Sequence, residues 1–210
     1  MKYLKLSISK LLMVLFLTII PSILVCQNYK DSIIELRVKH MGELMDTSNH
    51  ILNQKEIDNF EGLAYFEVDS TYRISGRFTK SVGGKFKMPT STDRLPVYRR
   101  YGYIEFEMGG TINRLTVYQN MVLKKKKGYK KYLFIPFRDG TTGIESYGGG
   151  RYLDFQIPTK TNVKLDFNCV YNPYCVYSYR YSCPIPPDEN TLTLPIKAGE
   201  KVPVGYLKEH

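Results

Sequence analysis

The chain has 210 residues, of which 43% are hydrophobic, 13% aromatic and 24% charged, with 16 glycines and 11 prolines. These proportions are typical of globular proteins, and they exclude a disordered chain, a collagen and a coiled coil. Four cysteines are too few for a disulfide-stabilised mini-protein, and the length suits one domain or at most two small ones. The formal net charge is +10. It says something about a binding partner only once the distribution of the charges along the chain is known.

The first 26 residues have the pattern of an export signal. Lys2, Lys5 and Lys10 form a basic start, and residues 11–25 form a mostly apolar run. This run fits the apolar region of a signal peptide and falls short of the ~20 residues that span a bilayer. We expect an exported protein that is periplasmic, secreted or associated with the envelope. Cleavage after Cys26, lipidation of Cys26 and an uncleaved anchor all remain open.

The positive charge is partly local. Without residues 1–26, which carry three lysines and no acid, the formal charge falls from +10 to +7. Six lysines then lie within residues 124–131. We interpret this run as a solvated hairpin tip that discourages edge-to-edge aggregation, and contact with an anionic envelope surface is the alternative. An exported protein rarely meets DNA, so we expect no nucleic-acid partner, and membrane contact only through an N-terminal anchor.

The mature chain begins with a helical pattern. Residues 28–51 carry apolar side chains at approximately helical spacing, namely Ile33, Leu36, Met41, Leu44 and Met45. A second short helix is predicted after Asn53, ending at Gly62. The periodicity then changes to two, which predicts strands at 63–68 and 72–78. We therefore divide the chain into a signal peptide (1–26), a helical segment packed on the domain (27–62) and a β-rich domain (63–210).

Residues 101–118 predict a β-hairpin. Gly109 and Gly110 lie between two alternating runs and suit a two-residue turn. The resulting register places Ile104 opposite Leu115 on one face, and Glu105 opposite Arg114 on the other. An apolar pair and an ion pair in one register support the prediction.

Four further strands are predicted, at residues 132–137, 151–157, 163–168 and 191–196. Short strands separated by glycine and proline, with no helices between them, are typical of antiparallel β folds. The predicted fold is mainly β: a single antiparallel β-sandwich or partly open barrel with one or two N-terminal helices.

The sequence contains no motif of a known catalytic or metal site. The histidines are His40, His50 and His210, and the motifs of zinc proteases, α/β-hydrolases, P-loops and dinucleotide-binding folds are missing. The cysteines lack the paired spacing of structural zinc sites. We therefore predict no catalytic residues, no metal and no cofactor.

Cys175 and Cys183 are close enough in sequence for a disulfide in an oxidising compartment. Closing this nine-residue loop would stabilise the fold by roughly 2.5 kcal/mol. Cys169 would remain a free, buried thiol. The alternative is that Cys175 and Cys183 are two buried thiols that do not pair.

Essentially the whole mature chain resembles a bacterial family of unknown function, DUF1684, and the C-terminal third is the most specific part. The resemblance rests on Phe137-Arg138-Asp139-Gly140-Thr141-Thr142-Gly143, Glu145-Ser146-Tyr147, Gly150-Arg151-Tyr152-Leu153-Asp154, Leu165-Asp166-Phe167-Asn168, Tyr171-Asn172-Pro173-Tyr174-Cys175-Val176-Tyr177, Cys183-Pro184-Ile185-Pro186-Pro187, Asn190 and Ala198-Gly199-Glu200-Lys201. Residues 60–66 are similar to the start of the family's first strand. The signal segment, the lysine run and Cys169 lie outside this pattern. The resemblance implies one β-rich domain without an established activity.

Several polar residues lie within or beside predicted strands, where Asp and Asn are disfavoured. The candidate cluster consists of Asp139, Thr142, Tyr147, Arg151, Asp154, Asp166, Asn168, Asn172, Tyr177 and Asn190. It could form a pocket in which Arg151 binds an anionic small molecule. Alternatively, it is a buried Arg–Asp network, with Asx turns at Asn168 and Asn172, that joins strand ends. By strand alternation, Tyr152 and Asp154 share one face and Arg151 points to the other.

Three functions remain open. The first is a non-enzymatic ligand-binding or interaction module of the cell envelope, in which the tyrosines between 171 and 181 would form a sugar-stacking face, although the chain has no Trp. The second is a hydrolase that uses Asp139, Asp154 or Asp166 as acid and base. The third is a structural envelope protein without a pocket.

Overall fold

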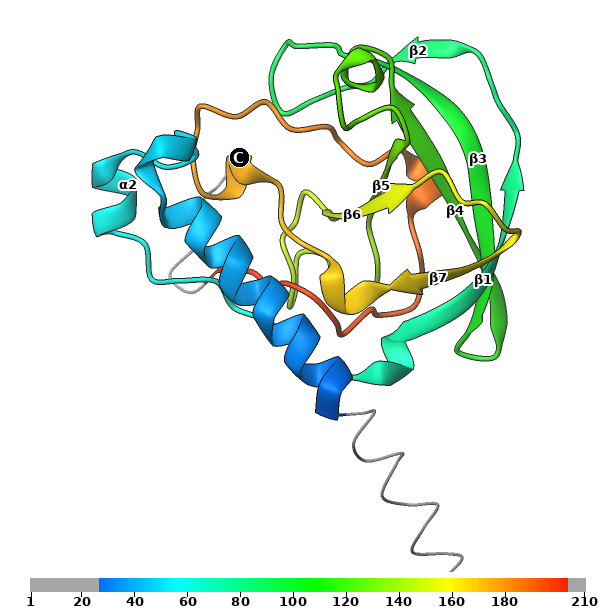
Figure 1. Ribbon diagram of the computed structural model, residues 1–210, viewed down its shortest axis with the longest axis horizontal. Coiled ribbons are helices and arrows are strands. Elements are labelled where there is room, and N and C mark those ends of the chain that lie inside the picture. The colour runs from blue at the N-terminus through cyan, green and yellow to red at the C-terminus, as the bar shows by residue number, and fades with distance from the viewer. Residues whose placement is uncertain (1–26, 204–210) are drawn as a thin grey trace, which may run out of the picture.

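The strands form one curled, antiparallel sheet that makes a half-barrel (Figure 1). The computed structural model describes residues 27–203. Within them the strands are β1 (Arg73–Lys80), β2 (Lys85–Lys87), β3 (Val97–Met108), β4 (Thr111–Asn120), β5 (Tyr132–Phe137), β6 (Arg151–Gln156) and β7 (Asn162–Asp166). The strand order is β6-β5-β4-β3-β1-β7, with β2 paired to the outer part of β3. The mainly β fold is therefore confirmed, in its partly open barrel form.

The predicted hairpin is β3 and β4. Ile104 faces Leu115 and Glu105 faces Arg114, as the sequence predicts. Both glycines of the turn have positive φ values, 62° and 71°, which match a tight two-residue turn. The expected ion pair is not formed between these described residues. Arg114 instead stacks over the ring of Tyr103, at 3.5 Å from the ring centre.

Two predicted strands are wrong. Residues 63–68 make only an isolated bridge, between Tyr65 and Glu200, because they cross the open side of the half-barrel and have no strand beside them. Residues 191–196 run irregularly along the β5–β6 end, where Thr191 bridges Arg138. This segment is held in place by buried side chains such as Leu192 and Ile196, and not by a continuous ladder of backbone hydrogen bonds. Residues 167 and 168, predicted as the end of a strand, belong to the 3₁₀ turn η4 (Phe167–Cys169).

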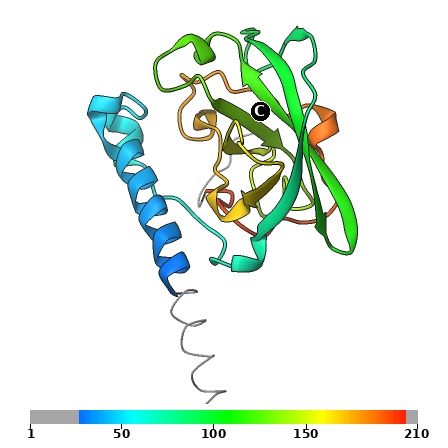
Figure 2. The ribbon, with the colours of Figure 1, turned by 45° about the vertical axis from the view of Figure 1, so that its right-hand side comes forward.

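The helical layer lies across the open side of the half-barrel (Figure 2). It consists of a helix over residues 27–45, the 3₁₀ turn η1 (Thr47–Asn49) and α2 (Gln54–Asp58). The first helix ends earlier than predicted, and α2 begins with a capping box between Asn53 and Glu56. Within residues 27–203, no helix is both long and apolar enough to cross a membrane. The remaining 3₁₀ turns are η2 (Ser70–Tyr72), η3 (Leu123–Lys125), η5 (Tyr174–Val176) and η6 (Asp188–Asn190).

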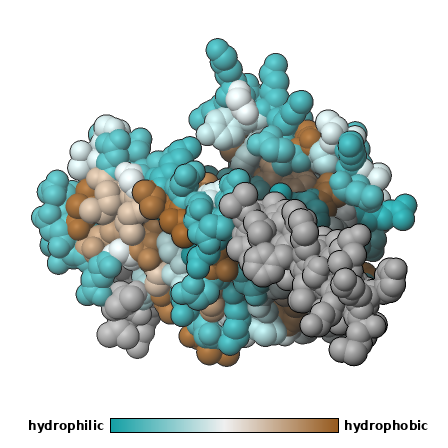
Figure 3. Space-filling view, turned by 60° about the horizontal axis from the view of Figure 1, so that its bottom comes forward, coloured by the Kyte–Doolittle hydropathy of each residue, from teal (hydrophilic) through white to brown (hydrophobic). Residues whose placement is uncertain are grey.

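The predicted apolar stripe of the first helix is only partly buried. Ile33 and Leu44 are buried, whereas Leu36 and Met45 are exposed by 43% and 38%. In Figure 3, hydrophobic atoms lie at the surface of the helical layer, on the left. The face turned toward the barrel instead includes the polar residues Arg37 and His40. Both belong to the site described below.

The curled sheet packs on both faces near β4–β6. One apolar cluster lies inside the half-barrel and includes Leu115, Ile135 and Phe167, all fully buried. The other lies on the opposite face and includes Tyr118, Phe134 and Tyr152, together with Cys175 and Cys183. The lysine run connects β4 to β5 and is mostly exposed, as the solvated-tip interpretation expects.

Candidate functional site

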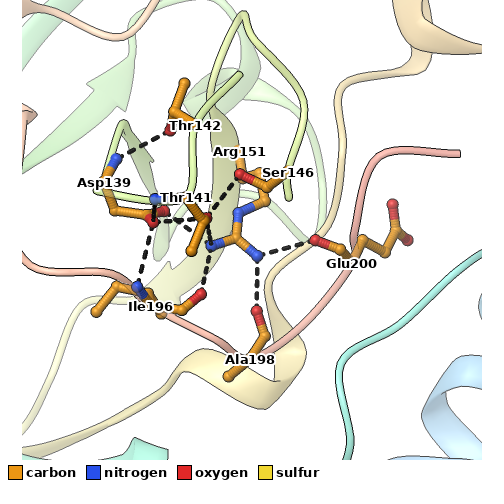
Figure 4. A network of polar contacts seen from close by, with 8 residues as sticks. All are labelled: Asp139, Thr141, Thr142, Ser146, Arg151, Ile196, Ala198 and Glu200. Atoms are coloured by element: carbon orange, nitrogen blue, oxygen red, sulfur yellow. Dashed lines mark hydrogen bonds and ion pairs between the residues drawn. The ribbon is translucent and has the colours of Figure 1, made fainter. Parts of the chain in front are cut away.

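Arg151 and Asp139 form the centre of a closed polar network (Figure 4). Their Nη2 and Oδ2 atoms are 2.8 Å apart, and both side chains are almost completely buried. The guanidinium also donates to the backbone carbonyls of Ile196, Ala198 and Glu200. Burial lowers the pKa of Arg151, and the adjacent Asp139 carboxylate opposes this change. The network therefore joins β6 to the C-terminal segment and leaves no room for a ligand.

Two threonines complete this network. Asp139 accepts hydrogen bonds from the backbone and hydroxyl groups of Thr141 and from the backbone N–H of Ile196. The backbone N–H of Asp139 donates to the hydroxyl of Thr142. Gly150 precedes Arg151 with a φ of 86°, and an added Cβ would lie 2.6 Å from the carbonyl oxygen of Phe137. Only glycine fits this turn without strain.

Asp166 and Asn168 make no contact with Arg151 and form a separate polar group. Both oxygens of Asp166 accept from the hydroxyl of Tyr29, on the first helix, at 2.9 Å. The Asn168 amide bonds to the Tyr29 hydroxyl and to the backbone of Asp69. This group attaches the helix to η4.

Asn190 has a structural role between β4 and β5, which share only one register pair, Tyr118 with Phe134. Its side chain accepts from the N–H of Thr116 and donates to the carbonyl oxygens of Thr116 and Pro136. The amide thus supplies hydrogen bonds where the two strands diverge, and Pro136 has no N–H of its own to contribute.

The three described cysteines carry free thiols in this structure. Cys175 and Cys183 lie side by side, since the backbone N–H of Cys175 contacts Sγ of Cys183 at 3.3 Å. Hydrogen bonding, mainly from Cys183 and with a contribution from Tyr147, lowers the pKa of Cys175 to about 7. Burial raises the pKa of Cys169 to about 12. The disulfide stays a prediction.

A large cavity lies between the first helix and the half-barrel, and we call it the helix–barrel cavity. Its volume is about 600 Å³, within the range of small-molecule sites. Tyrosine rings form much of its wall: Tyr65, Tyr98, Tyr132, Tyr152, Tyr171, Tyr174 and Tyr181. Three of the predicted stacking tyrosines are therefore here, whereas Tyr177 is bonded elsewhere and Tyr179 is 75% exposed.

Asp154 lines one end of this cavity. Its Oδ1 accepts hydrogen bonds from the hydroxyls of Tyr132, at 2.7 Å, and Tyr171, at 2.6 Å. Burial raises the pKa of both tyrosines, with Asp154 adding to the effect, so both hydroxyls stay protonated as donors. Tyr152 lines the same cavity, and the predicted separation of Tyr152 and Asp154 from Arg151 agrees with these positions.

His40 and Glu200 form a second polar group in the cavity. Nδ1 of His40 lies 2.9 Å from Oε1 of Glu200, whose side chain is fully buried. The other oxygen of Glu200 accepts from the backbone of Asn172 and the hydroxyl of Tyr177. Gly199, with a φ of 75°, lets the chain pass close to Val170 and places Glu200 here. The carboxylate orients the imidazole and leaves Nε2 without a hydrogen-bond partner among the described residues.

Arg37 lies one helical turn before His40 and also lines the cavity. Its Nη1 donates to the carbonyl oxygen of Phe66 at 3.0 Å, and its guanidinium stacks over Tyr65 at 4.3 Å. Its Nε and Nη2 atoms are buried and have no hydrogen-bond partner among the described residues. A buried, unsatisfied guanidinium edge is costly, and it is suited to donate hydrogen bonds to a ligand oxygen.

The ten predicted residues thus belong to several separate groups. Asp139, Thr142 and Arg151 form one network, Asp166 and Asn168 another, and Asn172 and Tyr177 support Glu200. Of the charged residues among these ten, only Asp154 lines the cavity. Sequence reasoning missed Arg37, His40 and Glu200. The available signal was the spacing Ile33, Arg37, His40, Leu44, which places two polar residues within a buried helical stripe.

The chain belongs to a family of β-rich proteins whose activity is not established. The family model described as a protein of unknown function (DUF1684) matches residues 58–201. The match includes Glu200 and Asp154, whereas Arg37 and His40 precede it.

A solved structure supports the assignment. The chain is similar to an uncharacterized protein from gene locus rrnAC0354 of Haloarcula marismortui, solved by solution NMR, with 30% sequence identity and a TM-score of 0.65. The similarity covers 86% of this chain and 97% of that one. A search among curated proteins found no match.

Proposed function

We propose that this protein is an exported binding module of the cell envelope, whose ligand is a small organic molecule held in the helix–barrel cavity. The observation that carries the proposal is the cavity itself, which has tyrosine walls and polar groups at fixed positions. Asp154 is held by two tyrosine hydroxyls and His40 by Glu200. Preorganised polar groups in an otherwise aromatic cavity are typical of ligand sites. The basic and apolar pattern of residues 1–26, outside the described residues, supports export.

Filling the cavity tests the proposal. Leu36 lines the cavity, whereas Val38 lies two residues further on the same helix, is 67% exposed and does not line it. Leu36→Trp should therefore occlude the site, and Val38→Trp is the matched control. We expect phenol, indole or a methyl glucoside to give saturation-transfer NMR signals with the wild type and the control, and to lose them with Leu36→Trp. Absence of binding, or binding unaffected by Leu36→Trp, would favour a structural role.

His40 favours a second candidate function, acid–base hydrolysis. A buried carboxylate that orients a histidine through Nδ1, with Nε2 left available, is the arrangement of a general base. Of the three carboxylates expected in a hydrolase, Asp139 and Asp166 are committed to other partners. The test is hydrolysis of p-nitrophenyl acetate and p-nitrophenyl phosphate. Activity lost in His40→Gln and kept in the exposed control His50→Gln would establish an enzyme.

A further inference from the structure

The unsatisfied edge of Arg37 indicates which chemical group the ligand carries. Within residues 27–203, this is the one guanidinium with two buried nitrogens that lack a hydrogen-bond partner. Nε–H and Nη2–H point to the same side of the planar guanidinium, so they form a fork that matches the two oxygens of a carboxylate or phosphate. Nη1 is already bonded to Phe66, which holds the fork in place.

No group of residues 27–203 hydrogen-bonds to this fork. Glu200, the buried acid of the cavity, uses its oxygens for His40, Tyr65, Asn172 and Tyr177. Glu67 is exposed and influences Arg37 only through its charge. Burial lowers the pKa of Arg37, and the charges of nearby groups oppose this effect, which keeps the guanidinium cationic.

The rest of the cavity sets the orientation of a ligand. Asp154, at the β6 end, would repel an anion and accept a hydrogen bond from a hydroxyl or ammonium group. Arg37, on the helix, offers N–H donors in the same cavity. We infer that Arg37 binds a carboxylate or phosphate group of a small organic ligand through Nε and Nη2. This inference rests on the proposed binding function and adds the class of ligand.

The test compares anionic probes with a neutral one of the same size. Calorimetric titration of the full chain with benzoate, phenyl phosphate and benzamide should show at least one anion binding tenfold or more tightly than benzamide. The tighter anion identifies the oxyanion. Arg37→Met should reduce the affinity for that anion at least tenfold and the affinity for benzamide by clearly less. Lys30→Met removes one exposed charge from the same helix and should change neither.

Two outcomes would overturn the inference. If benzamide binds as well as the anions and Leu36→Trp blocks it, the cavity binds ligands but Arg37 is not an oxyanion site. If no probe binds, the inference fails, and failure of phenol, indole and methyl glucoside as well would remove the binding function too. Should Arg37→Met not fold, Arg37→Lys decides: it keeps the charge but not the fork, and an unchanged affinity for the anion would contradict the inference.

Discussion

Arg151 and Asp139 form an ion pair inside the protein, with exposed side-chain fractions of 0% and 1% and an N–O distance of 2.8 Å. Backbone groups of residues 196–200 and Thr141 hydrogen-bond to the pair, whereas Nε of Arg151 has no partner among the described residues. It joins two parts of the chain that are some 45 residues apart in sequence. Arg151, expected either to bind an anion or to join strand ends, therefore joins β6 to the irregular segment 196–200.

Replacing Arg151 should destabilise the fold strongly. In Arg151→Met, Asp139 and three carbonyl groups lose their buried partner, so we expect the free energy of unfolding to fall by about 3–5 kcal/mol. Chemical denaturation measures this change. Lys197→Met, which removes an exposed ion pair to Glu145, is the control and should leave the free energy of unfolding nearly unchanged. An unchanged melting temperature for Arg151→Met would contradict the structural role.

Asn190 should be the second sensitive position. Asn190→Leu keeps the side-chain volume but leaves the N–H of Thr116 and two carbonyl oxygens without their partner. We expect a loss of about 2–4 kcal/mol in the free energy of unfolding. Asn162→Leu, at an exposed position on β7, should remain within about 0.5 kcal/mol. Similar stabilities for the two variants would show that the strands need no amide between them.

The two adjacent thiols should form a disulfide under oxidising conditions. Peptide mapping without reduction after incubation with glutathione disulfide should find Cys175 linked to Cys183 and Cys169 unpaired. Only the thiolate attacks a disulfide, and the pKa of Cys175 is lowered to about 7. The reaction rate should therefore rise with pH up to about 7 and then level off. Complete alkylation of all three thiols in the unfolded, unreduced protein would disprove the bridge.

Export is tested on the native protein. Cell fractionation and intact-mass measurement should find the chain in the envelope or outside the cell, most simply beginning at Gln27. A diacylglyceryl group on Cys26 would select the lipid-anchored alternative, and a retained N-terminus in the membrane fraction would select the uncleaved anchor. Full-length chain in the cytosol would contradict export altogether.

The local elements followed from the sequence. The hairpin of β3 and β4 was predictable to the residue because alternation and a two-glycine turn allow one register only. β5 and β6 were also predictable, to within one residue at their ends. The segments 63–68 and 191–196 were also predicted as strands but form none, because each meets its neighbour at an isolated bridge and not along a continuous ladder. Family membership was likewise carried by the sequence, in the motifs around Arg151 and Cys175.

The site was decided by the tertiary structure. Polar residues beside strands indicated that hydrogen-bonded side chains lay there. They did not indicate that Arg151 would be buried in the core while Asp154 faced a cavity. Arg37 and His40 lie more than 150 residues before Glu200, and only the packing of the first helix across the half-barrel brings the three together. A periodic pattern reports which face of an element is buried, because neighbours in sequence determine that face. It carries no information about which distant face the element meets, since that depends on how the whole chain closes around its core.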